Sequence, residues 1–179
     1  SACAPCDGFF YRGKKVAVVG GGDTACEEAL YLSNLASEVY LIVRKNYLRA
    51  SKVMQQRVFD KPNIKVLFNT NTEGLYGEEF LKGAHLVEFV GTPEENRFDL
   101  PIDGFFLAIG HTPNTSLFSS AIELDKEGYV VTDHPHTSTN IPGIFAAGDV
   151  ADPYYRQAIT AAGSGCRAAL DVERFLAER

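Results

Sequence analysis

A glycine-rich turn, Gly20-x-Gly22-x-x-Ala25, constrains the fold of this chain more than any other sequence feature. It follows residues 15–19, an apolar run that predicts a buried parallel strand. It opens residues 23–36, where small and apolar side chains recur every three or four positions and predict a helix. In this arrangement the first glycine permits a tight turn, the second lets the backbone approach a pyrophosphate, and a small third residue allows close packing of helix and strand. The alternative is an ordinary glycine-rich turn without a ligand.

Further apolar segments extend this turn into an α/β domain with a parallel sheet. A β-branched run at 39–43 completes a βαβ unit of about thirty residues. Residues 51–59 predict a helix with a serine N-cap, and residues 64–68 predict a third strand. Residues 70–100 alternate short strands with glycine and polar turns, which is typical of an antiparallel meander. A last apolar strand is expected at 104–109.

A segment that contains glycine and proline, 110–114, marks a candidate domain boundary. Beyond it we expect a strand at 128–131, an apolar stretch at 144–147 and a terminal helix at about 157–176. The predicted fold class is therefore α/β, with a Rossmann-like nucleotide-binding domain that carries an antiparallel meander, followed by a shorter second segment.

The charges after the second strand bear on the choice of nucleotide. An NAD site usually carries an acidic residue about 20 positions after the glycine motif, where it binds the ribose 2′-hydroxyl. Here Arg44 follows Ala25 by 19 positions, with Lys45 beside it and Arg49 close behind. These cations suit the 2′-phosphate of NADPH, because a guanidinium offers a phosphate a bidentate fork. A solvated basic surface at the end of a strand is the alternative.

A C-x-x-C motif, Cys3-Ala4-Pro5-Cys6, is followed directly by Asp7. The spacing brings two sulfurs within bridging reach and suits thiol–disulfide exchange, and the Asp7 carboxyl can exchange the proton that this chemistry needs. The alternative, half of a zinc site, needs two further ligands. The remaining cysteines and the four histidines show no such spacing, so no metal site is predicted. We expect Cys26 and Cys166 to be buried small residues.

Composition excludes several classes of function. The net charge is −6 and the pI is about 5.2, which argues against a nucleic-acid partner. No apolar run approaches the roughly 20 residues needed to cross a bilayer, so no membrane partner is expected. Without a leader pattern or a disulfide framework, the sequence indicates a reducing, cytoplasmic location.

Several motifs occur in an order that resembles the low-molecular-weight NADPH-dependent thioredoxin reductases. The matching segments carry redox, nucleotide-binding, hinge and flavin-binding motifs, at 1–8, 20–32, 110–114, 145–150 and 156–158. The resemblance implies a two-dinucleotide-binding-domain flavoprotein. Residues 1–112 would form an NADPH-binding domain with the redox C-x-x-C, and residues 113–179 would form the C-terminal segment of an FAD-binding domain.

The resemblance also implies roles for individual residues. Cys3, Cys6 and Asp7 would be catalytic, with Cys6 facing the flavin, Cys3 attacking the disulfide of thioredoxin and Asp7 acting as the acid. In the intact enzyme, a homodimer, electrons would pass from NADPH through FAD to this disulfide and then to thioredoxin or a thioredoxin-like protein. The expected cofactor-binding residues are Gly20, Gly22, Asp23, Thr24, Ala25, Arg44, Lys45, Arg49, Gly110, Asp149, Arg156, Gln157 and Ala158.

The sequence departs from the family's usual pattern at three positions and in length. Pro5 stands where Thr is more usual, and Val43 and Lys45 replace the commoner His and Arg of the basic motif. This variant is similar to the reductase part of thioredoxin-reductase/thioredoxin fusions. The family's N-terminal flavin-binding half is absent, so we expect the isolated chain to bind NADPH, to lack stable FAD and to be inactive. Two alternatives stay open: a related flavoprotein disulfide reductase that feeds a peroxiredoxin, and a non-catalytic NADPH-binding module.

Overall fold

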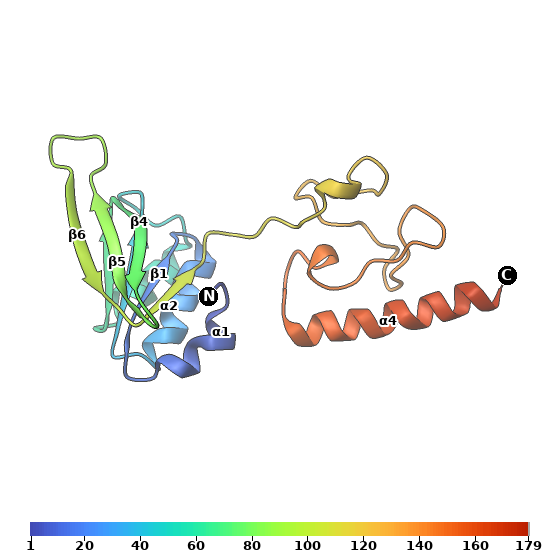
Figure 1. The fold of residues 1–179 in the computed structure, drawn as a ribbon, viewed down its shortest axis with the longest axis horizontal. Coiled ribbons are helices and arrows are strands. Elements are labelled where there is room, and N and C mark those ends of the chain that lie inside the picture. The colour runs from blue at the N-terminus through green and yellow to red at the C-terminus, as the bar shows by residue number, and fades with distance from the viewer. Residues whose placement is uncertain (179) are drawn as a thin grey trace. The chain divides into compact units, whose positions relative to one another are not determined.

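The chain divides into two compact units in the computed structural model, which describes residues 1–178 (Figure 1). Unit 1 is Ser1–Gly110, and unit 2 runs from His111 onward. The division falls two residues before the domain boundary that the sequence predicts after residue 112.

Unit 1 is built on a four-stranded parallel sheet. Its strands are β1 (Lys15–Val19), β2 (Glu38–Val43), β3 (Ile64–Phe68) and β7 (Gly104–Leu107). Their order across the sheet is β3-β2-β1-β7, and every neighbouring pair is parallel. The predicted α/β class and the predicted strands are therefore confirmed, although β7 ends two residues earlier than expected.

Two helices, α2 (Asp23–Ser33) and α3 (Lys52–Phe59), cover one face of this sheet. α2 ends three residues before the expected position, because the Leu32 carbonyl accepts the amides of both Leu35 and Ala36 in a turn. The buried residues of α2 are Ala25, Cys26, Ala29, Leu32 and Ser33. The predicted burial of Cys26 is thus confirmed.

The opposite face of the parallel sheet is covered by an antiparallel sheet (Figure 1). Its strands are β4 (Thr70–Gly77), β5 (Leu81–Glu88) and β6 (Asn96–Pro101), paired in the order β4-β5-β6. This confirms the predicted meander. The two sheets share a buried cluster made of Ala17, Ile42, Ala84, Leu86, Leu100 and Ile102. Unit 1 is therefore a three-layer structure with the parallel sheet in the middle.

The N-terminal segment that contains the C-x-x-C motif is fixed to the edge of the parallel sheet. It forms α1 (Ala4–Asp7) and the 3₁₀ turn η1 (Gly8–Tyr11). The Leu107 amide donates to the Ser1 carbonyl at 2.8 Å, beside β7. Ala4 is fully buried in the cluster that lies under the helices. The motif is therefore part of unit 1 and not a loose terminus.

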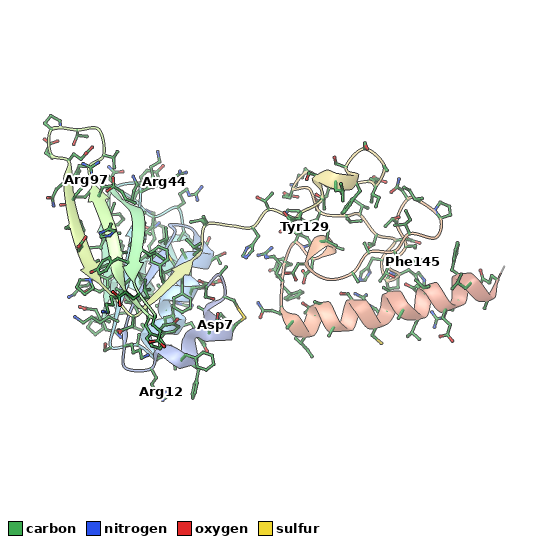
Figure 2. The ribbon with its side chains drawn as sticks, in the orientation of Figure 1. Asp7, Arg12, Arg44, Arg97, Tyr129 and Phe145 are labelled. Atoms are coloured by element: carbon green, nitrogen blue, oxygen red, sulfur yellow. A yellow bond between two sulfur atoms is a disulfide. The ribbon has the colours of Figure 1, made fainter. Side chains whose placement is uncertain are left out.

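Unit 2 consists of one long helix, α4 (Ala158–Ala177), and loops with the 3₁₀ turns η2 (Ser116–Phe118) and η3 (Asp149–Ala151). The predicted terminal helix is confirmed. The predicted burial of Cys166 is wrong, because its thiol is exposed on α4. The loops of unit 2 contact this helix at other positions, where Thr137 bonds to Asp171 and Phe145 packs edge-on against Phe175 (Figure 2).

The strand expected at 128–131 is also wrong. Val130 makes only an isolated bridge with Leu124. The reason is that neighbouring amides find acceptors on different segments: Val130 donates to the Val150 carbonyl and Val131 to the Glu123 carbonyl. No single partner strand therefore runs beside this stretch within the described residues.

Candidate nucleotide and disulfide site

The glycine turn between β1 and α2 has the geometry that a bound dinucleotide requires. Gly20 has φ +150°, and a Cβ there would stand 2.3 Å from the Ala108 carbonyl oxygen and 2.8 Å from the Ala25 Cβ. A side chain at this position would therefore clash with the segment that follows β7 and with α2. A Cβ on Gly22, the N-cap of α2, would meet nothing within 4 Å. The backbone at Gly22 thus faces open space, where a phosphate can approach the first amides of the helix.

A cavity of about 320 Å³ opens beside this turn, at the carboxyl ends of the parallel strands. This is the edge at which open α/β sheets bind ligands. The residues that line the cavity come from the end of β1 and the glycine turn, from the end of β2 and the segment after it, from the start of β4, and from the two residues after β7: Val19, Gly20, Gly21, Ile42, Val43, Arg44, Lys45, Tyr47, Arg49, Thr70, Asn71, Thr72, Ala108 and Ile109. The turn and the predicted basic residues therefore share one cavity.

The charges in this cavity are all positive among its described lining residues. Arg44, Lys45 and Arg49 are exposed, and the lining contains no carboxylate. Figure 2 shows Arg44 on unit 1, near the end of the sheet. A cavity with three cations and no acid favours a ligand with more than one phosphate group.

The segment that carries these cations is fastened to the glycine turn by three consecutive amides. The Gly21 carbonyl accepts the amides of Arg49 at 2.6 Å and Ala50 at 3.2 Å. The Asp23 carboxylate accepts the Ser51 amide at 2.9 Å. Ser51 in turn caps α3 through its hydroxyl, which accepts the Met54 amide at 3.4 Å, and this confirms the predicted serine cap.

Four residues of the predicted nucleotide motif lie beside the cavity and do not line it: Gly22, Asp23, Thr24 and Ala25. Ala25 is fully buried, where it lets α2 approach β1 closely. Gly110 closes unit 1 with φ +100° and also does not line the cavity. The structure therefore brings Gly20, Arg44, Lys45 and Arg49 together around one cavity and leaves the other motif residues outside its lining.

Cys3 and Cys6 form a disulfide in unit 1, with their Cα atoms 5.3 Å apart. Cys3 is half-buried and Cys6 is exposed. The Cys3 sulfur also accepts the Cys6 amide at 3.3 Å, so the pair lies across the single turn of α1. Asp7, the last residue of this turn, lies beside the disulfide (Figure 2). The three predicted catalytic residues therefore lie together.

The α1 turn is also tied to α2, since the Ala4 amide donates to the Glu28 carboxylate at 3.3 Å. The third cysteine of unit 1 has a different environment. Burial, with smaller effects of Asp23 and Glu27, raises the pKa of the Cys26 thiol to about 11. Cys26 is therefore a poor nucleophile, whereas the Cys3–Cys6 disulfide reaches the surface at Cys6.

In unit 2, Asp149 and Arg156 line one cavity of about 340 Å³. Arg156 has φ +49°, an uncommon conformation for a residue with a side chain. It is supported by the Asp152 carboxylate, which accepts the amides of Tyr154, Tyr155 and Arg156 and the Thr160 hydroxyl. Burial raises the pKa of Asp152, but these hydrogen bonds outweigh it and hold that pKa below its usual value.

The other two residues of the predicted flavin motif lie at the start of α4. Gln157 is its N-cap, paired with Thr160 in a capping box, and Ala158 is its first residue. Among the residues that the structure describes, no group of three or more His, Cys, Asp or Glu side chains is placed to hold a metal ion. No helix among them is long and apolar enough to cross a membrane.

A family model described as pyridine nucleotide-disulphide oxidoreductase matches residues 1–165. The chain belongs to this family. It is also a homologue of thioredoxin reductases, as the sequence motifs predict. The thioredoxin reductase of Eremothecium gossypii is 53% identical over 99% of this chain and 56% of its own length. For the Coxiella burnetii thioredoxin reductase the identity is 52%, over 98% of this chain and 57% of the relative.

Solved structures give the same result. The thioredoxin reductase of Streptococcus pyogenes superposes with a TM-score of 0.89 at 34% identity, over 100% of this chain and 57% of that one. The enzyme from Giardia duodenalis superposes with a TM-score of 0.81 at 40% identity, over 98% of this chain and 57% of that one. The chain thus spans about half the length of the thioredoxin reductases that it matches.

Sequence reasoning missed part of the cavity of this family member. Tyr47, Thr70, Asn71 and Thr72 line the cavity but were not predicted. They follow β2 and β3 in the chain, and the carboxyl ends of these parallel strands meet at one edge of the sheet. That sheet edge was the available signal, since loops that follow neighbouring parallel strands converge there.

Proposed function

We propose that the chain provides the NADPH site and the redox disulfide of a thioredoxin-disulfide reductase. The observation that carries the proposal is that one compact unit holds both a cation-lined cavity at the glycine turn and the Cys3–Cys6 disulfide. The activity is proposed for the protein at its natural length, because the chain spans about half of its relatives.

In this proposal residues 1–112 bind NADPH. The backbone at Gly20 and Gly22 and the first amides of α2 hold the pyrophosphate, and the open space in front of Gly22 supports this placement. Arg44 and Arg49, with Lys45, bind the 2′-phosphate. Two charge-assisted hydrogen bonds to that phosphate are worth about 3–6 kcal/mol before desolvation is subtracted.

Residues 113–179 provide the C-terminal part of an FAD site. Asp149 and Arg156 fit such a ligand, because a carboxylate that accepts from ribityl hydroxyls and a guanidinium that donates to polar ring atoms share one open cavity. Gln157 and Ala158 follow directly at the start of α4. When bound, FAD supplies the two-electron chemistry between the nicotinamide and the disulfide.

The disulfide transfers the electrons to the substrate. Reduction converts Cys3–Cys6 into two thiols and consumes one NADPH and one proton. The Cys3 thiolate then attacks the disulfide of oxidised thioredoxin to form a mixed disulfide, and one sulfur of thioredoxin leaves as a thiolate. Attack by Cys6 on Cys3 restores the Cys3–Cys6 bond and releases reduced thioredoxin. Asp7 holds and returns the proton beside this pair.

Exposed aromatic side chains next to the motif support a protein substrate. Phe9 is 64% exposed and Phe10 is 71% exposed, and the Arg12 guanidinium lies 5.3 Å from the Phe9 ring centroid. Such an exposed apolar pair is typical of a protein contact surface. We also propose that the whole enzyme is a homodimer that works in the cytoplasm, although two relatives are named mitochondrial thioredoxin reductases.

The test is NADPH oxidation coupled to the reduction of thioredoxin by the protein at its natural length. We expect turnover in the wild type and its loss in Cys3→Ser and Cys6→Ser, with NADPH binding retained in both variants. Cys26→Ser is the matched control, since it removes a buried thiol, and it should keep turnover. Thioredoxin reduction that persists in Cys6→Ser would refute the proposed electron path.

A further inference from the structure

We propose that Asp23 is a positioning residue for recognition of the 2′-phosphate: its side chain binds no part of the nucleotide, and it fixes the end of the segment that carries Arg44, Lys45 and Arg49. The inference rests on the proposed NADPH site and adds a determinant of its selectivity. Its basis is the juxtaposition of Asp23, the first residue of α2, with the Ser51 amide, where that segment ends.

The contact belongs to a row of three hydrogen bonds that joins the cation-bearing segment to the glycine turn and the start of α2, next to the cavity. The amides of residues 49, 50 and 51 all donate to the glycine turn, the first two to the Gly21 carbonyl and the third to the Asp23 carboxylate. Arg49 is the first residue in this row and lines the cavity. The position of its side chain therefore depends on how firmly the row is held.

The opposite side of the same segment is held by groups that do not involve the turn. Leu48 and Ala50 are each 5% exposed, so their side chains are anchored in the core. The Gln55 amide group donates to the carbonyls of Leu48 at 3.1 Å and Ala50 at 2.7 Å. These contacts hold the carbonyls of the segment, whereas Asp23 provides a side-chain acceptor for the amide of Ser51. Loss of Asp23 should loosen the segment without unfolding it.

A supporting role suits Asp23 better than a direct one. Its carboxylate does not line the cavity, and a negative charge would repel a phosphate there. The carboxylate lies instead at the N-terminus of α2, where the helix dipole stabilises it. Because a loosened cation must be reordered when it binds, loss of Asp23 weakens contacts to the 2′-phosphate more than backbone contacts to the pyrophosphate.

The test separates these two kinds of contact with ligands that carry no nicotinamide. Calorimetry on the 179-residue chain measures the affinities for adenosine 2′,5′-bisphosphate and for 5′-AMP, and the ratio of the two affinities isolates the 2′-phosphate. We expect the wild type to prefer the bisphosphate and Asp23→Ala to lower the ratio about tenfold. Asp23→Asn keeps an oxygen acceptor for the Ser51 amide and should keep the ratio within about threefold.

Control variants distinguish positioning from a change of charge. Glu27 lies four residues after Asp23 on α2. Glu27→Ala removes an equal charge there and should leave the affinity ratio unchanged. Arg44→Ala removes a proposed direct contact and should lower it. Ser51→Pro deletes the donor amide at a residue whose φ of −57° suits proline, and it should reproduce the effect of Asp23→Ala, whereas Ser51→Ala keeps the amide and the ratio.

Each outcome bears on a defined part of the account. A wild type without preference for the bisphosphate would refute the proposed NADPH site, and this inference with it. A wild-type preference that survives both Asp23→Ala and Ser51→Pro would overturn the inference alone. So would equal weakening of both ligands by Asp23→Ala, since a purely structural residue would act on both. The proposed positioning is supported if Asp23→Ala and Ser51→Pro both lower the affinity ratio and Asp23→Asn keeps it.

Discussion

Unit 1 and unit 2 bury their helices to very different degrees. In unit 1, α2 has 11 residues and buries five of them, whereas in unit 2 the 20 residues of α4 include none that is fully buried. The large side chains that are completely buried, such as Phe106, Leu32 and Leu41, belong to unit 1. The comparison shows that the parallel sheet of unit 1, covered on both faces, forms a core of its own, whereas the loops of unit 2 leave every described residue of α4 at least partly exposed.

Polar contacts have a larger part in holding unit 2 together. The Asp171 carboxylate accepts both the amide and the hydroxyl of Thr137 at 2.8 Å, and this ties a loop to α4. Asp152 organises the turn before α4 in the same manner. Hydrogen bonds to a carboxylate contribute about 1.5–3 kcal/mol each, about as much as burying one leucine or phenylalanine, but the large side chains that are completely buried lie in unit 1. Unit 1 should therefore be the more stable of the two.

The largest expected difference between the units is in the cost of truncating a leucine, measured as the loss in free energy of unfolding. Leu32→Ala opens a cavity in the core of unit 1 and should cost about 3 kcal/mol in free energy of unfolding. Leu176 is 64% exposed on α4, so Leu176→Ala should change that free energy by less than about 0.5 kcal/mol. Urea denaturation followed by circular dichroism measures both. Equal losses would break the comparison between the units.

The second largest expected difference between the units is in the rate at which their free thiols are labelled. Cys166 is exposed on α4, whereas Cys26 is fully buried on α2 and its pKa is raised to about 11. An alkylating reagent at neutral pH should label Cys166 in the native 179-residue chain and leave Cys26 unlabelled until the chain is denatured. Peptide mass spectrometry reports each site. Rapid native labelling of Cys26 would mean that the core of unit 1 opens more readily than its packing indicates.

The smallest effect concerns acid. In unit 1, hydrogen bonds from Lys65 and Tyr40, with a smaller one from Lys15, lower the pKa of Glu38 from 4.5 to about 2. Its contribution to stability is complete above the ordinary pKa and is lost as the pH falls from 4.5 through about 2. The stability difference between the wild type and Glu38→Gln should therefore shrink over this range.

Asp152 provides the matching test in unit 2, because its pKa also lies below the usual 3.8. The difference between the wild type and Asp152→Asn should shrink as the pH falls below that value. Denaturant midpoints at a series of acidic pH values measure both variants. A difference that stays constant down to pH values below both folded-state pKa values would show that these carboxylates do not contribute through their charge.

Elements defined by local sequence were predictable. The strands at 15–19 and 64–68 have the expected bounds, because each is a short apolar run between strong turn signals. The serine cap at Ser51 was likewise visible, since it depends on neighbouring residues alone. The co-location of Arg44, Lys45 and Arg49 with the glycine turn followed from the βαβ pattern.

Features that depend on long-range packing were not predictable. The stretch 128–131 has strand-like composition, but its amides bond to two separate segments. Cys166 lies in a small-residue helix whose contacts fall on other positions. Tyr47 and Asn71 share a cavity only because two strand ends meet. The bond from Ser51 to Asp23 spans 28 positions and leaves no periodic signal in the sequence.

The central claim is that electrons from NADPH reach the Cys3–Cys6 disulfide. The direct measurement is anaerobic incubation of the protein at its natural length with NADPH or NADH, followed by alkylation and peptide mass spectrometry. The account predicts that NADPH opens the disulfide, so that Cys3 and Cys6 each take one label, and that NADH at the same concentration opens it much more slowly. A disulfide that stays intact with NADPH, or that opens equally with either nucleotide, would contradict the account.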